Sequence, residues 1–336
     1  MGKKTVQTIT DIARIANVSK STVSRALNDS PLVKEETKAQ IRAIARQHNI
    51  RLNAPARRLS LKQSCTIALV THAYYQEFSV DDLFTLEIMG GIAHGLHELG
   101  YDMLVTQINP READWADQYL NSGRVDGFIV LTYGRKQSYV KHLVEIGAPF
   151  IAWGFASPNL SFSTVNGDNF SGGKQAAEHL IRTGRQRIAF LGGPASEMEV
   201  QLRFQGYESA LQAAGRKVDP ALVAYGDYCS SRGAEAMEHL LEAAPDLDAV
   251  FVNSDLMAIA AIDVIHQHGK RVPQDVAVIG YDDLSIASYY QPALTTVRQN
   301  IPLAGKLLAQ NLIQFLRTGI VSQVSMPVEL IVRQSA

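Results

Sequence analysis

The sequence predicts an α/β fold, in which an N-terminal helix-turn-helix headpiece precedes a two-lobed domain built on parallel sheets. Three observations support this prediction. Basic charge is concentrated near the N-terminus, the same region contains two short helical patterns separated by a turn, and strand-like and helix-like segments alternate in the remainder. The chain has 336 residues, which corresponds to two or three domains at roughly 100–200 residues per domain.

The charge is divided unevenly along the chain. Residues 1–63 carry 13 lysines and arginines against four acidic residues, a net charge of +9, whereas the other 273 residues carry 19 basic and 29 acidic residues. A basic terminal module on an acidic body is typical of proteins that bind a polyanion. Because this module is also rich in Ile, Val, Leu and Ala, we expect it to fold and not to form a solvated tail.

Composition and motifs exclude several classes of protein. No apolar run approaches the ~20 residues that a membrane-spanning helix needs, and the N-terminus lacks the apolar core of an export signal. Cys65 and Cys229 fit neither a disulfide scaffold nor a zinc site, and they suit a reducing cytoplasm. The chain has no phosphate-binding loop, no dinucleotide-binding glycine motif and no nucleophile elbow. We therefore expect no enzyme activity, no cofactor, no metal site and no membrane association.

The basic module has the pattern of a helix-turn-helix followed by a third helix. The expected helices span residues 11–16, 20–27 and 34–48. Thr10 is the expected N-cap of the first helix and Ser19 that of the second. Ile12, Ala13 and Ala16 form the apolar face of the first helix, which predicts close packing against its neighbours.

In a helix-turn-helix the second helix enters the major groove, and its first residues face the base edges. Here those residues are Lys20, Ser21 and Thr22, with Arg25 one turn later. Lys and Arg suit the acceptors of guanine, whereas Ser is permissive. The expected phosphate contacts are Ser19, Ser24 and Asn28. The alternative is a three-helix module that binds protein, but the excess of positive charge favours DNA.

After residue 64, short apolar segments rich in β-formers alternate with helix-like segments. The expected strands are 66–70, 103–106, 127–131, 149–153, 187–191, 249–252 and 276–280. The expected helices include 87–99, 172–182, 203–214, 232–243 and 255–268. Buried strands separated by helices indicate a doubly wound parallel sheet. Roughly 270 residues are many for one sheet, so we expect two similar lobes.

Polar and aromatic side chains follow the predicted strands, where ligands bind in folds of this type. These side chains are His72, Tyr74, Trp153, Arg203, Tyr228, Ser254 and Asp282. Their mixture of carboxylate, guanidinium and hydroxyl groups with aromatic faces suits a sugar. Asp168, Asp255 and Asp283 could instead cap helices, and Trp153 could belong to the core.

Residues 8–28, TITDIARIANVSKSTVSRALN, resemble the DNA-binding headpiece of the LacI/GalR family of transcription regulators. This resemblance adds Thr8 to the DNA-contacting residues. Residues 53–59 resemble the hinge helix of the family, which lies in the minor groove. The resemblance assigns this contact to Asn53, Ala56, Arg57 and Leu59, with Leu59 as an apolar wedge between base pairs. Pro55 falls in the first turn of this helix, where its missing N–H costs little.

The resemblance covers nearly the whole chain and implies a core like that of periplasmic binding proteins. The implied domains are a headpiece (1–51), a hinge helix and linker (52–63) and an effector-binding and dimerisation domain (64–336). The implied N-lobe comprises about 64–162 and 295–322, and the C-lobe about 163–294 and 323–336. The resemblance also assigns effector contacts to Arg203, Tyr228, Asp282 and Gln299, and it extends them to His72 and Tyr74. Phe84 is a further expected effector contact. Ser254 stands where many members have Asn.

The predicted function is a sequence-specific DNA-binding regulator in the cytoplasm, associated with the nucleoid. We expect a repressor of carbohydrate-utilisation genes whose operator affinity is changed by a small sugar. A regulator that responds to a purine or another metabolite is one alternative. A sugar-binding transport protein is another, although it would need an export signal and would not need the headpiece.

The expected partners are double-stranded, pseudo-palindromic operator DNA and a second copy of the chain. A two-fold operator requires a two-fold protein, and the resemblance implies that the lobed domains form the homodimer. The chain ends at LIVRQSA (330–336), directly after a strand-like segment, without leucine heptads. We therefore expect a dimer, and not a tetramer joined by a C-terminal leucine-heptad helix.

Overall fold

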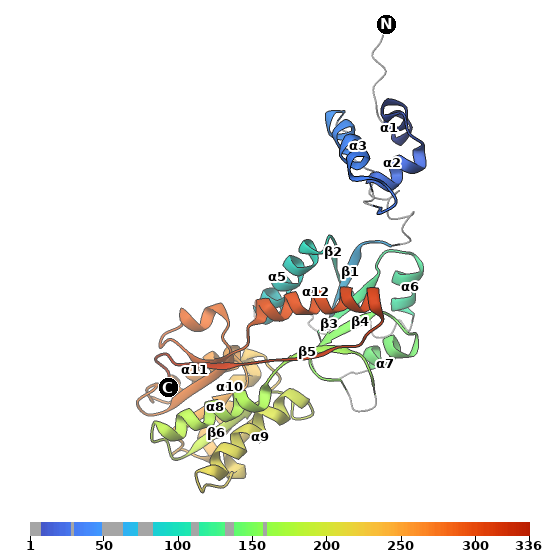
Figure 1. Cartoon of the computed structure of the whole chain (residues 1–336). Helices are drawn as coiled ribbons and strands as arrows, with labels where there is room; N and C mark the ends of the chain where they lie inside the picture. Colours follow the sequence, from blue (N-terminus) through green and yellow to red (C-terminus); the bar gives the residue numbers. More distant parts are fainter. Residues whose placement is uncertain are drawn as a thin grey trace. The chain divides into compact units, whose positions relative to one another are not determined.

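The computed structural model describes residues 8–27, 30–48, 63–72, 83–108, 114–131, 138–156 and 160–336 (Figure 1). The chain divides into two compact units, Met1–Ser64 and Cys65–Ala336. Among the described residues, no helix is both long and apolar enough to cross a membrane.

The first unit contains the three predicted helices. They are α1 (Ile9–Ala16), α2 (Lys20–Leu27) and α3 (Glu35–Gln47). Ile12, Val23, Ala26 and Ile41 are fully buried where these helices meet. The apolar faces that the sequence predicted therefore form one small core, and the helix-turn-helix is confirmed.

The N-cap of α1 is Thr8, so the prediction of Thr10 was wrong. The Thr8 side chain accepts from the backbone N–H of Asp11 at 3.3 Å, and the Asp11 carboxylate accepts from the backbone N–H of Thr8 at 3.1 Å. This reciprocal capping box requires an acidic or amide side chain three residues after the cap. Only Thr8 has Asp11 at that spacing, so α1 begins at Ile9 and Thr10 lies inside its first turn.

The second unit contains two six-stranded sheets. The sheet of the N-lobe has the order β11-β5-β4-β3-β1-β2, and all of its pairings are parallel. Its strands are β1 (Thr66–His72), β2 (Asp102–Ile108), β3 (Gly127–Leu131), β4 (Phe150–Trp153), β5 (Ser163–Gly167) and β11 (Gln323–Met326). α5 (Leu83–Glu98) and α12 (Ile301–Thr318) cover one face of this sheet, and α6 (Trp115–Asn121) and α7 (Ser138–Glu145) cover the other.

The sheet of the C-lobe has the order β12-β10-β9-β8-β6-β7, in which only β12 is antiparallel to its neighbour. Its strands are β6 (Ile188–Gly192), β7 (Val223–Tyr225), β8 (Ala249–Val252), β9 (Ala277–Asp282), β10 (Thr295–Arg298) and β12 (Glu329–Ile331). Its helices are α8 (Asn169–Arg182), α9 (Met198–Ala213), α10 (Ser230–Ala243) and α11 (Asp255–Gln267), with short 3₁₀ turns η1 (Pro220–Leu222) and η2 (Ser285–Ser288). Every residue of β9 is buried, as expected where helices cover both faces of a parallel sheet.

The chain passes between the lobes a few residues later than the sequence predicted. The expected boundaries preceded 163, 295 and 323. However, β5 and β11 pair with each other in the N-lobe sheet, and β10 pairs with β9 in the C-lobe sheet. The three crossings therefore follow residues 167, 298 and 326, because the hydrogen-bonded neighbour of a strand decides its lobe.

The helices α5 and α12 cross at glycines. A Cβ atom on Gly91 would lie 2.3 Å from the carbonyl oxygen of Pro302, and one on Gly305 would lie 2.5 Å from that of Ile88. Real Cβ atoms do not approach backbone this closely, so the two helices pack at a distance that only glycine permits. This contact fixes α12 on the N-lobe and the start of α12 near the crossing after β10.

Substitution of Gly91 by alanine is expected to destabilise the second unit by about 1–3 kcal/mol, because the added methyl group overpacks a backbone contact. The adjacent Gly90 provides a matched control, since a Cβ atom there has nothing within 4 Å. Gly90→Ala is expected to stabilise the helix by up to ~1 kcal/mol. Chemical unfolding of both variants measures the difference, and equal effects at the two positions would contradict the close crossing.

Candidate functional sites

The helix α2 exposes the side chains that the sequence assigned to base contacts. Lys20, Ser21 and Arg25 are exposed, while Val23 and Ala26 point into the core of the headpiece. One face of α2 is therefore held by packing, and the other carries two cations and a hydroxyl. This is the arrangement that a major-groove helix requires.

Several predicted DNA contacts already have structural roles at helix starts. The Ser19 hydroxyl accepts from the backbone N–H of Thr22 at 3.1 Å and lies 2.8 Å from the Thr22 hydroxyl. Thr8 caps α1, and Ser24 is half-buried. The remaining predicted DNA contacts lie outside the described residues: Asn28, Asn53, Ala56, Arg57 and Leu59.

The central residue of the second candidate site is Arg203, which is only 5% exposed. It lies in the second turn of α9, and a Cβ atom on Gly173 of α8 would be 2.0 Å from its carbonyl oxygen. Its Nε donates to Asn169 Oδ1 at 2.7 Å, and its Nη1 donates to the carbonyl of Asn253 at 2.6 Å. The guanidinium carbon lies 3.6 Å from the ring centroid of Tyr281, a cation–π contact.

These contacts use two of the three guanidinium nitrogens of Arg203. The third nitrogen, Nη2, is not among the buried polar atoms that lack a partner in the described part of the chain. A cation that is fixed on one side and open on the other can donate to a ligand without losing rotamer freedom on binding. Arg203 therefore has the geometry of a preorganised hydrogen-bond donor.

Asp282, at the carboxyl end of β9, is the acidic counterpart of Arg203. Gln299 Nε2 donates to its Oδ1 at 2.7 Å, and both residues are buried. Burial raises the pKa of the Asp282 carboxyl to about 7, opposed by the charge of Arg203 and by the Gln299 hydrogen bond, and Glu87 adds to the rise. The structure thus brings the predicted residues Arg203, Asp282 and Gln299 together.

Tyr228 completes this side of the site. It has a φ of 71°, and its ring lies so close to Gly193 that a Cβ atom there would be 2.4 Å from it. Burial raises the pKa of the Tyr228 hydroxyl, and the charge of Arg203 opposes the rise, whereas Asp282 adds to it. Tyr228 therefore lies within electrostatic reach of both charged residues.

Two further residues of this region were not predicted. Glu199 lies one turn before Arg203 on α9, and burial raises the pKa of its carboxyl while Arg203 lowers it. The amide of Asn253 is fully buried, and neither of its polar atoms has a hydrogen-bond partner among the described residues. The sequence feature that could have identified Asn253 is its position directly after β8, at the same sheet edge as Asp282.

The N-lobe contributes aromatic side chains. Phe84 of α5 and Trp153 at the end of β4 have ring centroids 5.9 Å apart, and both belong to the N-lobe core. Trp153 is 7% exposed, so it is chiefly a core residue. His72 ends β1, but its side chain lies outside what the structure describes, as does the whole of Tyr74.

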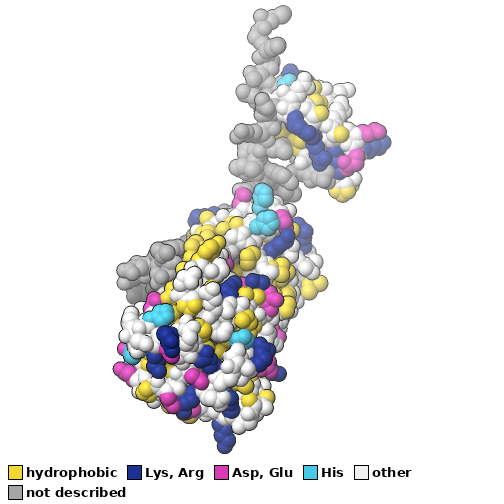
Figure 2. All heavy atoms as spheres, turned by 90° about the vertical axis from the view of Figure 1, so that its left-hand side faces the viewer, with side chains coloured by type: hydrophobic (Ala, Val, Ile, Leu, Met, Phe, Trp, Pro, Cys, Tyr) yellow, Lys and Arg dark blue, Asp and Glu magenta, His cyan; other side chains and the backbone are white. Residues whose placement is uncertain are grey.

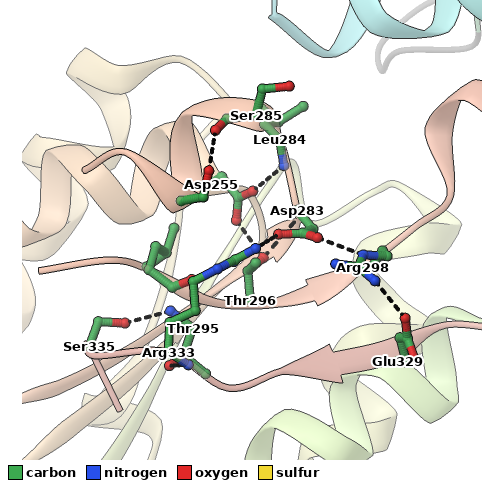
Figure 3. A network of polar contacts seen from close by, with 12 residues as sticks. Asp255, Asp283, Leu284, Ser285, Thr295, Thr296, Arg298, Glu329, Arg333 and Ser335 are labelled. Carbon is green, nitrogen blue, oxygen red and sulfur yellow. Dashed lines mark hydrogen bonds and ion pairs between the residues drawn. The ribbon is translucent and has the colours of Figure 1, made fainter. Parts of the chain in front are cut away.

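The remaining polar candidates have structural contacts. Ser254 accepts from the backbone N–H of Met257 at 3.3 Å and so caps α11, and Asp168 caps α8. Asp255, which could have capped a helix, is instead fully buried and accepts from the backbone N–H of Leu284 at 2.7 Å. Asp283 forms ion pairs with two arginines (Figure 3).

The turn after β9 also joins the lobes. Leu284 belongs to the N-lobe core, and Glu87 Oε1 of α5 accepts from both the backbone N–H and the hydroxyl of Ser285, at 3.0 and 2.9 Å. The residues that follow Asp282 by two and three positions therefore contact the other lobe directly. The backbone from Asp282 to Ser285 therefore connects the candidate site to the N-lobe.

Part of the N-lobe surface is apolar. Figure 2 shows hydrophobic side chains gathered on the upper part of the second unit. On the N-lobe, Leu86 of α5 is 57% exposed, Val105 of β2 42% and Leu303 of α12 43%, and on the C-lobe Tyr289, which follows η2, is 83% exposed. A groove of about 500 Å³ between α5 and α12 includes Leu86 and Leu303. A contiguous exposed apolar patch is typical of a surface that binds another molecule.

The raised pKa of Asp282 predicts a pH-dependent effect on stability. A folded-state pKa of about 7, above the ordinary value of 3.8, means that the folded protein holds this proton more tightly than the unfolded chain. The carboxyl therefore costs stability progressively as pH rises from about 4 through about 7. Asp282→Asn does not titrate, so it is expected to gain stability relative to the original protein between pH 5 and 8, by ~1.4 kcal/mol per pKa unit.

Chemical unfolding at about pH 5 and pH 8 measures this difference. Asp275→Asn is the control, because Arg271 lowers the pKa of the Asp275 carboxyl to about 2 by hydrogen bonding, so it is ionised at both pH values. The free-energy difference caused by Asp275→Asn is expected to be the same at both. An equally pH-independent difference for Asp282→Asn would show that Asp282 is ionised throughout.

Comparison with known proteins extends these geometric observations. Residues 8–53 match the bacterial regulatory proteins of the lacI family, and residues 177–336 match a periplasmic binding protein-like domain. The HTH-type transcriptional regulator CelR of Thermobifida fusca is 36% identical over 334 residues, which are 98% of this chain and 97% of that protein.

Solved structures agree over the same length. The complex of the transcriptional regulator CelR with cellobiose has a TM-score of 0.76 and 34% identity, covering 98% of this chain and 99% of the other. The lac repressor dimer bound to operator and the anti-inducer ONPF has a TM-score of 0.78 and 27% identity over 98% of both chains. A match to DNA-binding regulators along the headpiece and the lobes favours a regulator over a transport protein. This chain belongs to the LacI family of bacterial regulatory proteins.

Proposed function

We propose that this protein represses carbohydrate-utilisation genes and that a sugar bound between its lobes changes its affinity for operator DNA. The observation that carries the proposal is the preorganised trio of Arg203, Asp282 and Gln299, which offers an open donor, a carboxylate and an amide. Neighbouring sugar hydroxyls act as both donors and acceptors and match such a set.

The aromatic residues supply the second requirement of a sugar site. Tyr228 lies near the polar trio, and Phe84 and Trp153 lie together in the N-lobe. Aromatic faces cover the C–H surfaces of a pyranose ring, while polar groups fix its hydroxyls. The similarity to the CelR–cellobiose complex makes a glucose-based disaccharide the first candidate. We include His72, Tyr74 and Ser254 in the proposed site on sequence grounds.

For the DNA side, we propose that Lys20, Ser21, Thr22 and Arg25 face the bases of the major groove. The proposed backbone contacts are Thr8, Ser19, Ser24 and Asn28. The proposed minor-groove contacts are Asn53, Ala56, Arg57 and Leu59. A protein of this kind acts on the chromosome in the cytoplasm. Phosphate contacts would position the headpiece, and base contacts would specify the sequence.

We propose further that the protein acts as a homodimer through the apolar surface that includes Leu86, Val105, Leu303 and Tyr289. A pseudo-palindromic operator requires two headpieces related by a two-fold axis. The likeness to the lac repressor dimer on operator supports the same arrangement. A sugar that favours one relative orientation of the lobes would change the geometry of the paired headpieces, which is a population shift.

A thermal-shift screen tests the ligand class. The panel contains cellobiose, glucose, ribose and a hexuronate, with hypoxanthine to represent purines. A ligand at 100 times its Kd stabilises the folded state by ~2.7 kcal/mol, so the effector is expected to raise the Tm clearly, and we expect cellobiose or another sugar. A shift with hypoxanthine alone would contradict the sugar assignment and favour a purine-responsive regulator.

Reciprocal titrations then test regulation. DNA duplexes selected from a random pool supply an operator, and its affinity is measured with and without the effector found in the screen. Linkage requires that operator changes effector affinity by the same factor by which effector changes operator affinity. A non-specific duplex is the control. Identical operator affinity with and without saturating effector would contradict a ligand-responsive repressor.

A further inference from the structure

The last residue of β9 and the residue that follows it have unusual backbone conformations. Asp282 has a φ of 114° and Asp283 a φ of 56°. Neither is glycine, so these conformations cost free energy and persist only where neighbouring groups hold them. The turn matters because it sets the direction in which the Asp282 carboxyl leaves the sheet. Interactions that hold the turn therefore act on the proposed effector site without touching the ligand.

The carboxylate of Asp283 is held by two arginines (Figure 3). Arg298 Nε donates to Oδ2 and Arg333 Nη2 donates to Oδ1, each at 2.6 Å. The Asp283 side chain is only 7% exposed, so solvent screens these charge-assisted hydrogen bonds less than it would at the surface. Both carboxylate oxygens of Asp283 are thus occupied by protein groups.

Arg333 is itself fixed by the segment that carries it. Its Nη1 donates to the carbonyl of Leu294 at 2.8 Å, and its backbone N–H donates to Thr295 Oγ1 at 2.9 Å. Farther along, the Ser335 hydroxyl accepts from the backbone N–H of Thr295 at 2.8 Å. The segment after β12 therefore lies along the start of β10, and Figure 3 shows the Arg333 side chain extending from it to Asp283.

The guanidinium of Arg333 thereby joins both ends of the segment 283–294. This segment begins at the turn after Asp282, includes Ser285, which contacts Glu87 of the N-lobe, and ends at the carbonyl of Leu294. The Arg333 guanidinium alone bonds to both Asp283 and the Leu294 carbonyl, and no other described side chain does so.

Arg298 and Arg333 differ in how strongly their ion pairs restrain Asp283. Arg298 is 42% exposed and shares its guanidinium with the exposed Glu329, at 2.8 Å. Arg333 is 17% exposed and has no second carboxylate among the described residues. Because exposed ion pairs contribute little, Arg333 is the stronger of the two ion-pair partners of Asp283.

We propose that Arg333 is a positioning residue for the effector site: by holding Asp283, it keeps Asp282 in the orientation that binds the sugar. The proposal rests on the proposed function, and it gives the segment after β12 a role in ligand recognition. Arg333 acts through Asp283 and does not contact the ligand.

Calorimetric titration with cellobiose tests the proposal, or with the panel sugar of largest thermal shift if cellobiose gives none. Arg333→Ala is expected to weaken sugar binding roughly tenfold, the effect of losing one charge-assisted hydrogen bond. Arg333→Lys is expected to retain part of the affinity, because an ammonium can pair with Asp283 but cannot span to the Leu294 carbonyl at the same time.

A double-mutant cycle separates positioning from general stability. In an Asp282→Asn background, Arg333→Ala is expected to cause no further loss of affinity, because its effect passes through Asp282. A purely structural role would lower affinity equally in both backgrounds. Arg271→Ala is the matched control, since it removes an arginine that bonds both oxygens of Asp275, at 2.9 Å each, elsewhere on the C-lobe. We expect it to leave sugar affinity unchanged.

The outcomes distinguish this proposal from the proposed function. Unchanged affinity in Arg333→Ala, with weak binding by Asp282→Asn, would overturn the positioning role and leave the effector site intact. Unchanged affinity in Asp282→Asn would contradict the effector site itself. Should Arg333→Ala fail to fold, Asp283→Asn provides the same test, because it removes the charge and keeps the shape of the side chain.

Discussion

The site depends on one buried cation. Removing the Arg203 guanidinium from water is costly unless its donors are satisfied. The fold satisfies two of its nitrogens with Asn169 and the Asn253 carbonyl, and the face of Tyr281 covers the cation. These partners come from α8, the end of β8 and β9. The packing of these C-lobe elements therefore fixes the position of the Arg203 guanidinium. The glycine contact between α8 and α9 allows the Arg203 backbone to approach closely enough for this arrangement.

The turn after β9 connects that cation to the rest of the molecule. Asp282 lies within electrostatic reach of Arg203, Asp283 is held by arginines, Leu284 enters the N-lobe core and Ser285 bonds to Glu87. Four consecutive residues thus combine the proposed ligand contact with restraint of the turn, apolar packing and contact between lobes. Two of them have positive φ, which is a common feature of functional turns that surrounding structure holds in place.

The sequence predicted the features that depend on local pattern. The headpiece helices, the apolar faces with Ile12 and Ala16, and the strands 127–131 and 249–252 agree with the structure. The cap at Thr8 was missed because two threonines compete and only the capping box separates them. β11 and β12 lie at sheet edges and are only partly buried, so they lack the continuous apolar run of the buried strands, and α12 contains Pro302 and Gly305, which lower helix propensity. The arginines that hold Asp283 are 15 and 50 residues away in the chain, so only the fold brings them together.

The central claim is that Arg203 is a fixed donor for a ligand whose binding controls DNA affinity. The most direct measurement compares Arg203→Gln with the original protein in two titrations, one with the effector and one with operator alone. Gln keeps an amide donor and part of the length but removes the charge and the cation–π contact. We predict that effector binding is lost while operator affinity without effector is retained. Effector affinity equal to that of the original protein, in a variant that binds operator normally, would contradict the account.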